Sequence, residues 1–569
     1  MIAPDPDDPD IVYGGRVEKL DLRTKQTREI DPTLAYPAAE WRKAWTLPLA
    51  FSRQGPRVLY FANQRLFRTA DGGQHWAAAS PDLTRDDSTI PPNLDPSTAA
   101  DDDHLTKYRG VIYTIAPSPL DASLLWVGTD DGLVWRSNDG GAHWTNITPP
   151  LFTPWSKIAG IEPSHCNANT AYIAVDRHRL DDDTPYLYRT TDGGKSWTRL
   201  DAGIPRNAFV NVVREDPSCR GLLYAGTERG MFVSFDGGAQ WQSLQQNLPM
   251  TSVRDIDLHG DDVVIATHGR GFWIMDDATA LRQMTDARVD AVVLFKPAIA
   301  IRFRPSGFTG TPFPKDEPMA ANPPDGAIID YSLPAGIRGP VTLTIRDASN
   351  NFVRRFDSAD KQTPPDPYKL EFAPEWVKPK FVLAATPGMH RFVWDLRYPP
   401  PSALREYDGV WAPPGSYTVT LNAGGKSATQ PLTLTPDPRV NLPAGALQRE
   451  FVLATKVANS WSQAAAALAE AAKLSKALQG HTDPQSIRSN AAILDLSGVT
   501  HESENVPVRP PRRADSLAAL ATDLENLERA VDGADADPSL DAGASYDTLS
   551  HMLANTLQEW DRMRDRRRN

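Results

Sequence analysis

An eight-residue pattern, Ser/Thr-x-Asp-Gly-Gly-x-x-Trp, occurs four times in the first half of the chain and constrains its fold more than any other feature. The copies hold the pairs Asp71 and Trp76, Asp139 and Trp144, Asp192 and Trp197, and Asp236 and Trp241. A pattern that returns every few dozen residues indicates a repeat architecture, in which each copy belongs to one supersecondary unit.

The apolar runs around the fourth copy, "GLLYAGTERGMFVSFDGGAQWQSL", predict three short strands separated by Gly-containing turns, which is a β-meander. In the Asp-Gly-Gly turn, glycine adopts positive φ without strain. The aspartate is able to accept backbone N–H bonds, and the tryptophan ring packs over the hairpin. We therefore expect these four aspartates to be structural, because a catalytic acid is not needed once in every repeat.

The pattern resembles the Asp-box, or BNR repeat, of β-propellers in sialidases, tandem-propeller xyloglucanases, sortilin-type receptors and a photosystem II assembly factor. Longer stretches, such as "VDRHRLDDDTPYLYRTTDGGKSW" and "ATHGRGFWIMDD", are similar to bacterial sortilin-like proteins described as BNR-repeat glycosyl hydrolases. This resemblance covers about residues 5–440 and implies a β-propeller, but the group has no settled reaction to carry over.

Proteins of that group are usually exported and longer than this chain. The resemblance therefore implies a secreted or periplasmic protein, with an upstream propeller half on a separate or missing chain. The N-terminus "MIAPDPDDPDIVYGG" lacks the basic and apolar regions of a signal peptide, so the chain is expected to be cytoplasmic if it is complete as given.

The chain is expected to be mainly β, with an Asp-box β-propeller over residues 1–277. About six blade-like units are predicted, which leaves ring closure open: 9–35, 45–80, 108–148, 156–200, 206–245 and 250–277. A Pro-rich linker follows at 278–327. Alternating apolar and polar residues over 328–440 predict an Ig- or fibronectin-like β-sandwich.

Residues 441–569 are predicted to form a helical hairpin or bundle, because apolar residues recur there at spacings of three and four. One predicted face holds Leu517, Leu520, Leu524 and Leu527. Another holds Tyr546, Leu549, Leu553, Leu557, Trp560 and Met563.

Composition argues against several functions. The 60 Lys and Arg residues against 72 Asp and Glu residues give a net charge of −12, which disfavours nucleic-acid binding. No apolar run reaches the ~18 residues of a membrane-spanning helix. Cys166 and Cys219 lack zinc-site spacing and are expected to be unpaired, buried thiols, so neither a metal nor another cofactor is predicted.

A propeller normally binds its ligands on the loops around its axis. Several charged segments of this chain follow predicted strands and are expected to lie on such loops. Mixed acids, arginines and aromatic residues are able to bind peptides or sugars by hydrogen bonds and stacking. The predicted ligand-binding residues are Asp130, Arg177, His178, Arg179, Glu228, Arg229, His268, Arg270 and Trp273.

A glycosidase needs two carboxylates at a fixed gap, one of them with a raised pKa. Asp131, paired with Asp181 or Asp182, is the catalytic candidate in that case. The opposing interpretation is that these acids fix turns, which the reappearance of "GTDDG" as "GTERG" favours. A sialidase would need an Arg-Ile-Pro signature that the chain lacks.

The leading hypothesis is an exported binding or scaffold protein whose propeller face holds a peptide or a glycan. The alternative is a glycoside hydrolase, such as a xyloglucanase, or a fragment of one. An assembly factor is a third hypothesis that rests on fold analogy alone.

Overall fold

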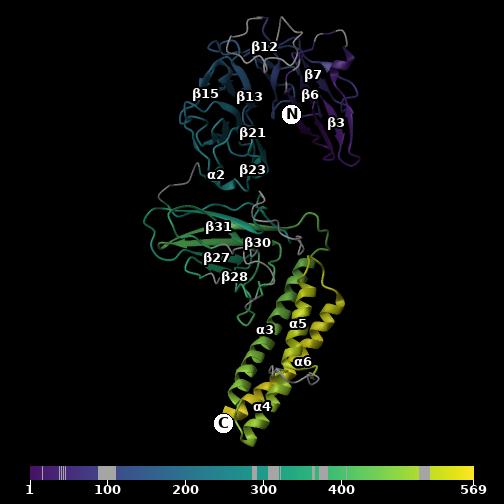
Figure 1. The fold of residues 1–569 in the computed structure, drawn as a ribbon, viewed down its shortest axis with the longest axis vertical. Helices are drawn as coiled ribbons and strands as arrows, with labels where there is room; N and C mark the ends of the chain where they lie inside the picture. Colours follow the sequence, from purple (N-terminus) through teal and green to yellow (C-terminus); the bar gives the residue numbers. More distant parts are fainter. Residues whose placement is uncertain are drawn as a thin grey trace. The chain divides into compact units, whose positions relative to one another are not determined.

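The chain forms two compact units, residues 1–285 and 286–569 (Figure 1). The computed structural model describes residues 1–15, 17–36, 39, 41–42, 44, 46–86, 110–284, 291–305, 320, 322–361, 366–368, 370, 382–404, 407–498 and 513–568. The fold is mainly β, with antiparallel sheets throughout the first unit and a helical part at the C-terminal end.

The described part of the first unit holds six antiparallel sheets that follow one another in chain order. Sheet 1 contains β1 (Ile2–Pro4), β2 (Ile11–Gly14), β3 (Glu18–Asp21) and β4 (Gln26–Glu29), and sheet 2 contains β5 (Leu49–Phe51), β6 (Leu59–Ala62), β7 (Leu66–Thr69) and β8 (Ala77–Ala78). Sheet 3 contains β9 (Ile112–Pro117), β10 (Leu125–Thr129), β11 (Val134–Ser137) and β12 (Thr145–Asn146). Sheet 4 contains β13 (Lys157–Pro163), β14 (Ala171–Arg177), β15 (Asp182–Thr190) and β16 (Thr198–Arg199).

Sheet 5 contains β17 (Val210–Glu215), β18 (Leu223–Thr227), β19 (Gly230–Ser234) and β20 (Gln242–Ser243), and sheet 6 contains β21 (Val253–His259), β22 (Asp262–Thr267) and β23 (Phe272–Met275). Two short 3-10 helices, η1 (Pro32–Ala35) and η2 (His178–Leu180), lie between strands. Helix α2 (Thr279–Gln283) follows sheet 6 and packs Leu281 into the core between sheets 5 and 6.

Successive sheets pack face to face as the blades of a propeller. The first strand of each sheet lies against the first strand of the next, from β1 on β5 to β17 on β21. Each apolar cluster is shared by neighbouring sheets, as where Tyr172 of sheet 4 and Phe232 of sheet 5 lie in one buried core. Burying the two faces of each strand in this way explains the near-continuous apolar runs of β10 and β18.

The four repeated motifs form the same turn between the third and fourth strands of sheets 2 to 5. In the fourth copy, Asp236 Oδ1 accepts the Gln240 N–H at 2.9 Å and the Ser234 hydroxyl at 2.8 Å. The Ser234 hydroxyl oxygen in turn accepts the Gly238 N–H at 2.9 Å. Asp71, Asp139 and Asp192 make the corresponding bonds.

The motif tryptophans join neighbouring sheets. Each indole Nε1 donates to a carbonyl that follows the last strand of the preceding sheet: Trp76 to Ile30 at 2.8 Å, Trp144 to Ala79 at 2.9 Å, Trp197 to Ile147 at 3.1 Å and Trp241 to Leu200 at 2.7 Å. A Cβ at the second glycine would strike that same neighbour, for example Leu200 Cδ1 at 2.8 Å from Gly238. The motif therefore both closes its own turn and fits against the preceding sheet.

Within the described part of the first unit, sheets 1 and 6 have exposed apolar side chains on their outward faces. In β23, Trp273 and Met275 pack toward sheet 5, whereas Phe272 is 80% exposed and Ile274 is 59% exposed on the other face. In sheet 1, Ile2 is 75% exposed. Among the described residues, the strands of sheet 6 make no extensive contact with those of sheet 1, so the succession of sheets does not close on itself there.

The second unit begins with two sheets that share one core. One sheet has the order β24 (Val293–Leu294), β26 (Ala327–Leu333) and β29 (Gly388–Trp394). The other has the order β25 (Ala300–Arg302), β31 (Lys426–Pro436), β30 (Gly415–Ala423), β27 (Thr342–Asp347) and β28 (Phe352–Asp357). Alternate residues of both sheets, such as Tyr331 and Val419, meet in the core.

The predicted linker at 278–327 needs correction at three places. Helix α2 belongs to the first unit, while β24 pairs with β26 and β25 pairs in parallel with β31. Strands of two or three residues are too short to show an alternating pattern, and their pairing depends on partners far along the chain.

Helices α3 (Ala446–Leu478), α4 (Pro484–Ser497), α5 (Leu517–Val531) and α6 (Leu540–Arg568) complete the second unit around one apolar cluster. The predicted leucine face of α5 is confirmed, because all four leucines lie in this cluster. On α6, Leu553 and Trp560 are buried, and the other four predicted residues pack against the same cluster. Helix α4 lies within the predicted helical region, and Asp483 caps it by accepting the Ser486 N–H at 2.8 Å.

A candidate ligand-binding edge of the propeller

The predicted ligand-binding loops all lie at one edge of the first unit, here called the 2–3 edge. It is formed by the turns between the second and third strands of sheets 3 to 6, together with the beginnings of their first strands. Thr129 at the end of β10, for example, pairs with Ile112 at the start of β9. The Asp-Gly-Gly turns lie at the other end of the strands, as shown by the Gly140 N–H that donates to Ser123 O before β10.

Asp130 and Asp131 form the turn of sheet 3, and neither is open to solvent. Asp131 is 2% exposed; its Oδ1 accepts the Thr129 hydroxyl at 2.5 Å and its Oδ2 accepts the Arg85 N–H at 2.8 Å. Asp130 Oδ1 accepts the Val111 N–H at 2.8 Å. Burial raises the pKa of both carboxyls, and the charge of Asp131 adds to the rise at Asp130.

The buried Asp176 carboxylate organises the edge of sheet 4. Its Oδ1 accepts the His178 N–H at 3.0 Å and lies 2.6 Å from His178 Nδ1, while Lys157 Nζ lies 3.6 Å from its Oδ2. Burial alone raises the pKa of Asp176, but His178 and Lys157 hold it below its usual range. The His178 ring stacks on Phe209, with ring centres 4.8 Å apart.

Asp181 and Asp182 are also parts of a turn. Asp181 ends η2 in the left-handed conformation, with φ of 56°. Asp182 accepts the Thr184 N–H at 3.1 Å and the Tyr186 hydroxyl at 2.8 Å, and Arg177 lies 3.5 Å from it. These partners outweigh the effect of burial and lower the pKa of Asp182. The three carboxylates considered as catalytic candidates therefore all have structural partners or positions.

The edges of sheets 5 and 6 are dominated by cationic side chains. Glu228 Oε2 accepts the Ser252 hydroxyl at 2.7 Å and lies 3.4 Å from Arg254. Arg229 donates to Asn207 O at 2.8 Å and is otherwise exposed. His268 and Arg270 are exposed on the turn between β22 and β23.

Trp273 differs from its prediction, and three residues of the edge were not predicted. Trp273 packs partly into the core between sheets 5 and 6, and its Nε1 donates to Arg270 O at 3.0 Å, so its ring is not a free stacking surface. Lys157, Phe209 and Arg254 belong to the same edge but were missed. A signal existed for them, because each lies at or directly before the start of the first strand of its sheet, beside a loop that the sequence indicates.

Replacing Asp130 by asparagine is expected to flatten the pH dependence of stability. The unfolded chain ionises this carboxyl near pH 4, whereas its folded pKa is raised by burial. Over that interval the folded state binds more protons, so stability falls as pH rises. The difference in thermal midpoint, Asp130→Asn minus the unsubstituted chain, should therefore increase between about pH 5 and about pH 8. Asp192→Asn is the control: hydrogen bonds from Ser196 and Thr190 lower the carboxyl pKa to about 2, so its difference should stay constant over this interval. If the thermal midpoints of Asp130→Asn and of the unsubstituted chain differed by the same amount at every pH, the expectation would be contradicted.

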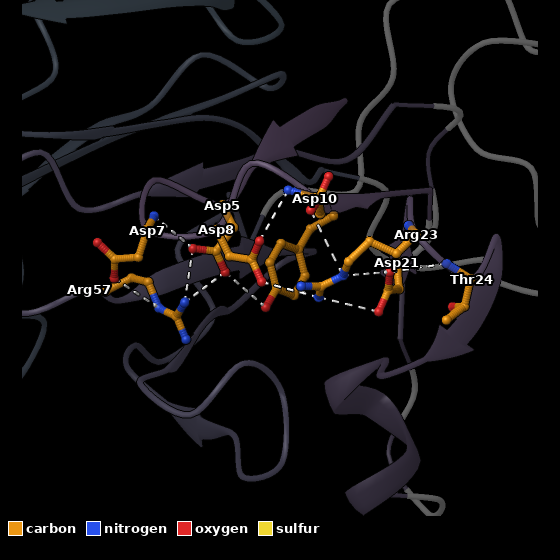
Figure 2. Close-up of polar contacts among 9 residues, drawn as sticks. Asp5, Asp7, Asp8, Asp10, Asp21, Arg23, Thr24 and Arg57 are labelled. Carbon is orange, nitrogen blue, oxygen red and sulfur yellow. Dashed lines mark hydrogen bonds and ion pairs between the residues drawn. The ribbon is translucent and has the colours of Figure 1, made fainter. Parts of the chain in front are cut away.

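Arginines of the same unit pair with aspartates of the N-terminal segment. In the acidic N-terminal segment, Arg57 lies 2.7 Å from Asp5, and Arg23 lies 3.3 Å from Asp8 and 3.2 Å from Asp21 (Figure 2). Among the described residues, no cluster of three or more His, Cys, Asp or Glu side chains is placed to hold a metal ion.

The expectation of two buried thiols is wrong in part. Both cysteines are free, but Cys166 is exposed and Cys219 is half-buried. Their places just before the second strands of sheets 4 and 5 put them in turns, whose burial an apolar pattern does not reveal. Within the described residues, no helix has the length and apolar character required to cross a membrane.

No family model matches the chain. A probable oligoxyloglucan-reducing end-specific xyloglucanase of Neosartorya fischeri is 22% identical over 193 residues, which are 34% of this chain and 22% of that protein. An oligoxyloglucan-reducing end-specific xyloglucanase of Emericella nidulans is 27% identical over 109 residues, 19% of this chain and 13% of that protein. The matches thus span less than a quarter of either curated relative.

Solved structures are similar to this chain at comparably low sequence identity. The GH74 xyloglucanase of Xanthomonas campestris is 16% identical, with 63% of this chain and 65% of that chain covered and a TM-score of 0.29. YCF48 of Cyanidioschyzon merolae is 17% identical, with 30% and 54% covered and a TM-score of 0.24.

Proposed function

We propose that this chain is a binding protein of the Asp-box, sortilin-like type, exported from the cell, whose 2–3 edge of sheets 3 to 6 holds a peptide or a glycan. The observation that carries the proposal is the contrast between the two kinds of charge at this edge. Asp131, Asp181 and Asp182 are tied into turns, whereas Arg229, His268 and Arg270 are exposed.

Catalysis by these carboxylates would require a different arrangement. A glycosidase places two carboxyl groups about 5–9.5 Å apart on either side of the scissile bond, both within reach of substrate. Asp131 is 2% exposed and both of its oxygens already accept hydrogen bonds. The lowered pKa of Asp182 suits a carboxylate that stabilises its own turn rather than a general acid.

A glycoside hydrolase is the second candidate function. It is favoured by the raised pKa of Asp130, which is the property of a general acid, and by the names of the curated relatives. Asp130 would need to become accessible, since it is 8% exposed and bonded to Val111.

One experiment separates the two functions. The purified chain is incubated with xyloglucan, β-glucans, sialosides and a library of short peptides, and both retention of ligand and release of reducing sugar are measured. Retention without release is the expected result. Release that disappears in Asp130→Asn or Asp131→Asn, with folding intact by circular dichroism, would overturn the binding function in favour of hydrolysis.

We also propose that the two-sheet part of the second unit is an Ig- or fibronectin-like module. The support is its strand order: β24, β26 and β29 in one sheet, and β31, β30, β27 and β28 in the other, with β25 parallel to β31 at the edge.

A further inference from the structure

We propose that the edges of sheets 5 and 6 bind an acidic peptide, with Arg229 and Arg270 receiving its carboxylates and the exposed Met250 and Phe272 receiving its apolar side chains. This inference rests on the proposed binding function and names its ligand class.

The edges of sheets 5 and 6 carry a local excess of positive charge. The described turns and first-strand beginnings of sheets 5 and 6 carry the exposed side chains Arg206, Arg229, Arg254, His268 and Arg270. Two carboxylates lie beside them: Glu228, which accepts the Ser252 hydroxyl, and Asp255, which accepts Arg214 Nη2 at 2.7 Å. This surplus stands against a net charge of −12 for the whole chain, so it marks a local potential that attracts anions.

Arg229 and Arg270 are available to an anionic ligand, whereas Arg254 is paired with Glu228. Glu228 is engaged by Ser252 and Arg254, so it does not neutralise Arg229 or Arg270. Arg229 donates its Nε–H to Asn207 O, and its Nη1 lies 3.9 Å from the exposed Met250 sulfur, a weak acceptor. Within the described residues, the Arg270 side chain makes no hydrogen bond or ion pair. A guanidinium so placed offers paired donors that match a carboxylate.

The surroundings of these arginines suit a peptide better than a neutral glycan. Neutral sugar hydroxyls and ring faces are recognised by acceptor side chains and open aromatic faces. Here the Trp273 ring is packed and Glu228 is already bonded. Met250, 69% exposed, precedes β21, and Phe272, 80% exposed, directly follows the turn that carries Arg270. Flexible apolar side chains beside arginines suit a peptide that alternates acidic and apolar residues.

The test uses the full chain and fluorescence anisotropy of a labelled synthetic peptide of alternating Glu and Leu. A peptide with Gln in place of Glu is the ligand control, and unlabelled polygalacturonate is the competitor. Arg229→Ser/Arg270→Ser should weaken binding by about tenfold or more, and rising NaCl should weaken it further. Arg28→Ser, which removes another exposed arginine of the same unit, should leave binding unchanged. Each replaced side chain is exposed, so all variants are expected to fold.

Each other outcome has a definite meaning. Equal binding of the Glu and Gln peptides, or equal binding by the double variant and Arg28→Ser, overturns the assignment to these arginines. Polygalacturonate that binds directly through the same arginines while the peptide fails overturns the peptide and keeps an anionic glycan. Failure of both anions, with retention of an uncharged glycan in the earlier experiment, overturns this inference and leaves the proposed binding function standing.

Discussion

Replacing Trp241 by alanine is expected to lower the free energy of unfolding of the first unit by about 3–5 kcal/mol. Its side chain is 2% exposed and fills the core between sheets 4 and 5, and its indole Nε1 donates to Leu200 O at 2.7 Å. The substitution therefore leaves a cavity and an unpaired carbonyl together. In calorimetry of the full chain, the transition of the first unit should fall by on the order of 10 °C.

Two further variants separate the causes of this effect. Trp241→Phe keeps most of the ring and loses the hydrogen bond, so it should cost about 1–3 kcal/mol. Phe272→Ala removes an aromatic ring that is 80% exposed and should change stability by no more than about 0.5 kcal/mol. Equal shifts for Trp241→Ala and Phe272→Ala would contradict a role of the motif tryptophan in joining sheets.

Local sequence predicted the sheets well because their turns are local. The Asp-Gly-Gly turn involves residues within eight positions, so each motif indicated the third and fourth strands of its sheet directly. Whether the sheets close into a ring depends on contacts between residues hundreds of positions apart, which no motif encodes. In the sequence, Ile2 and Phe272 do not differ from other strand residues, and only the fold shows that they are exposed.

The candidate site was predictable in location and not in accessibility. The turns after β10, β14, β18 and β22 repeat at equivalent places in their sheets, so their charged residues were expected on one edge. The partners of those charges come from elsewhere: Arg85 reaches Asp131, and Lys157 reaches Asp176. Such pairings decide which acids are buried, and the sequence spacing carries no information about them.

Replacing Glu450 by alanine is expected to lower the free energy of unfolding of the second unit by about 3–5 kcal/mol. Glu450 lies at the start of α3, and its Oε1 accepts Arg302 Nη2 at 2.8 Å and Arg304 Nη2 at 2.5 Å. Arg302 and Glu450 are each 1% exposed, so the substitution leaves a buried guanidinium without its closest counter-ion. The Asp535 carboxylate, 3.2 Å from Arg302, remains as a partial substitute.

The loss of stability arises from the uncompensated charge of Arg302. Removing that charge as well should therefore restore much of the lost stability. Arg302→Met/Glu450→Leu is expected to be more stable than Glu450→Ala, because it removes the buried guanidinium together with its counter-ion while Arg304 keeps Asp532 and Asp535 as partners. Arg302 Nε and Nη1 make no hydrogen bond within the described chain, which makes its burial costly even in the native pair. Glu525→Ala, which breaks an exposed pair with Arg529, should cost only about 0.3–0.5 kcal/mol. A double variant less stable than Glu450→Ala would instead assign the stabilisation to the ion pair itself.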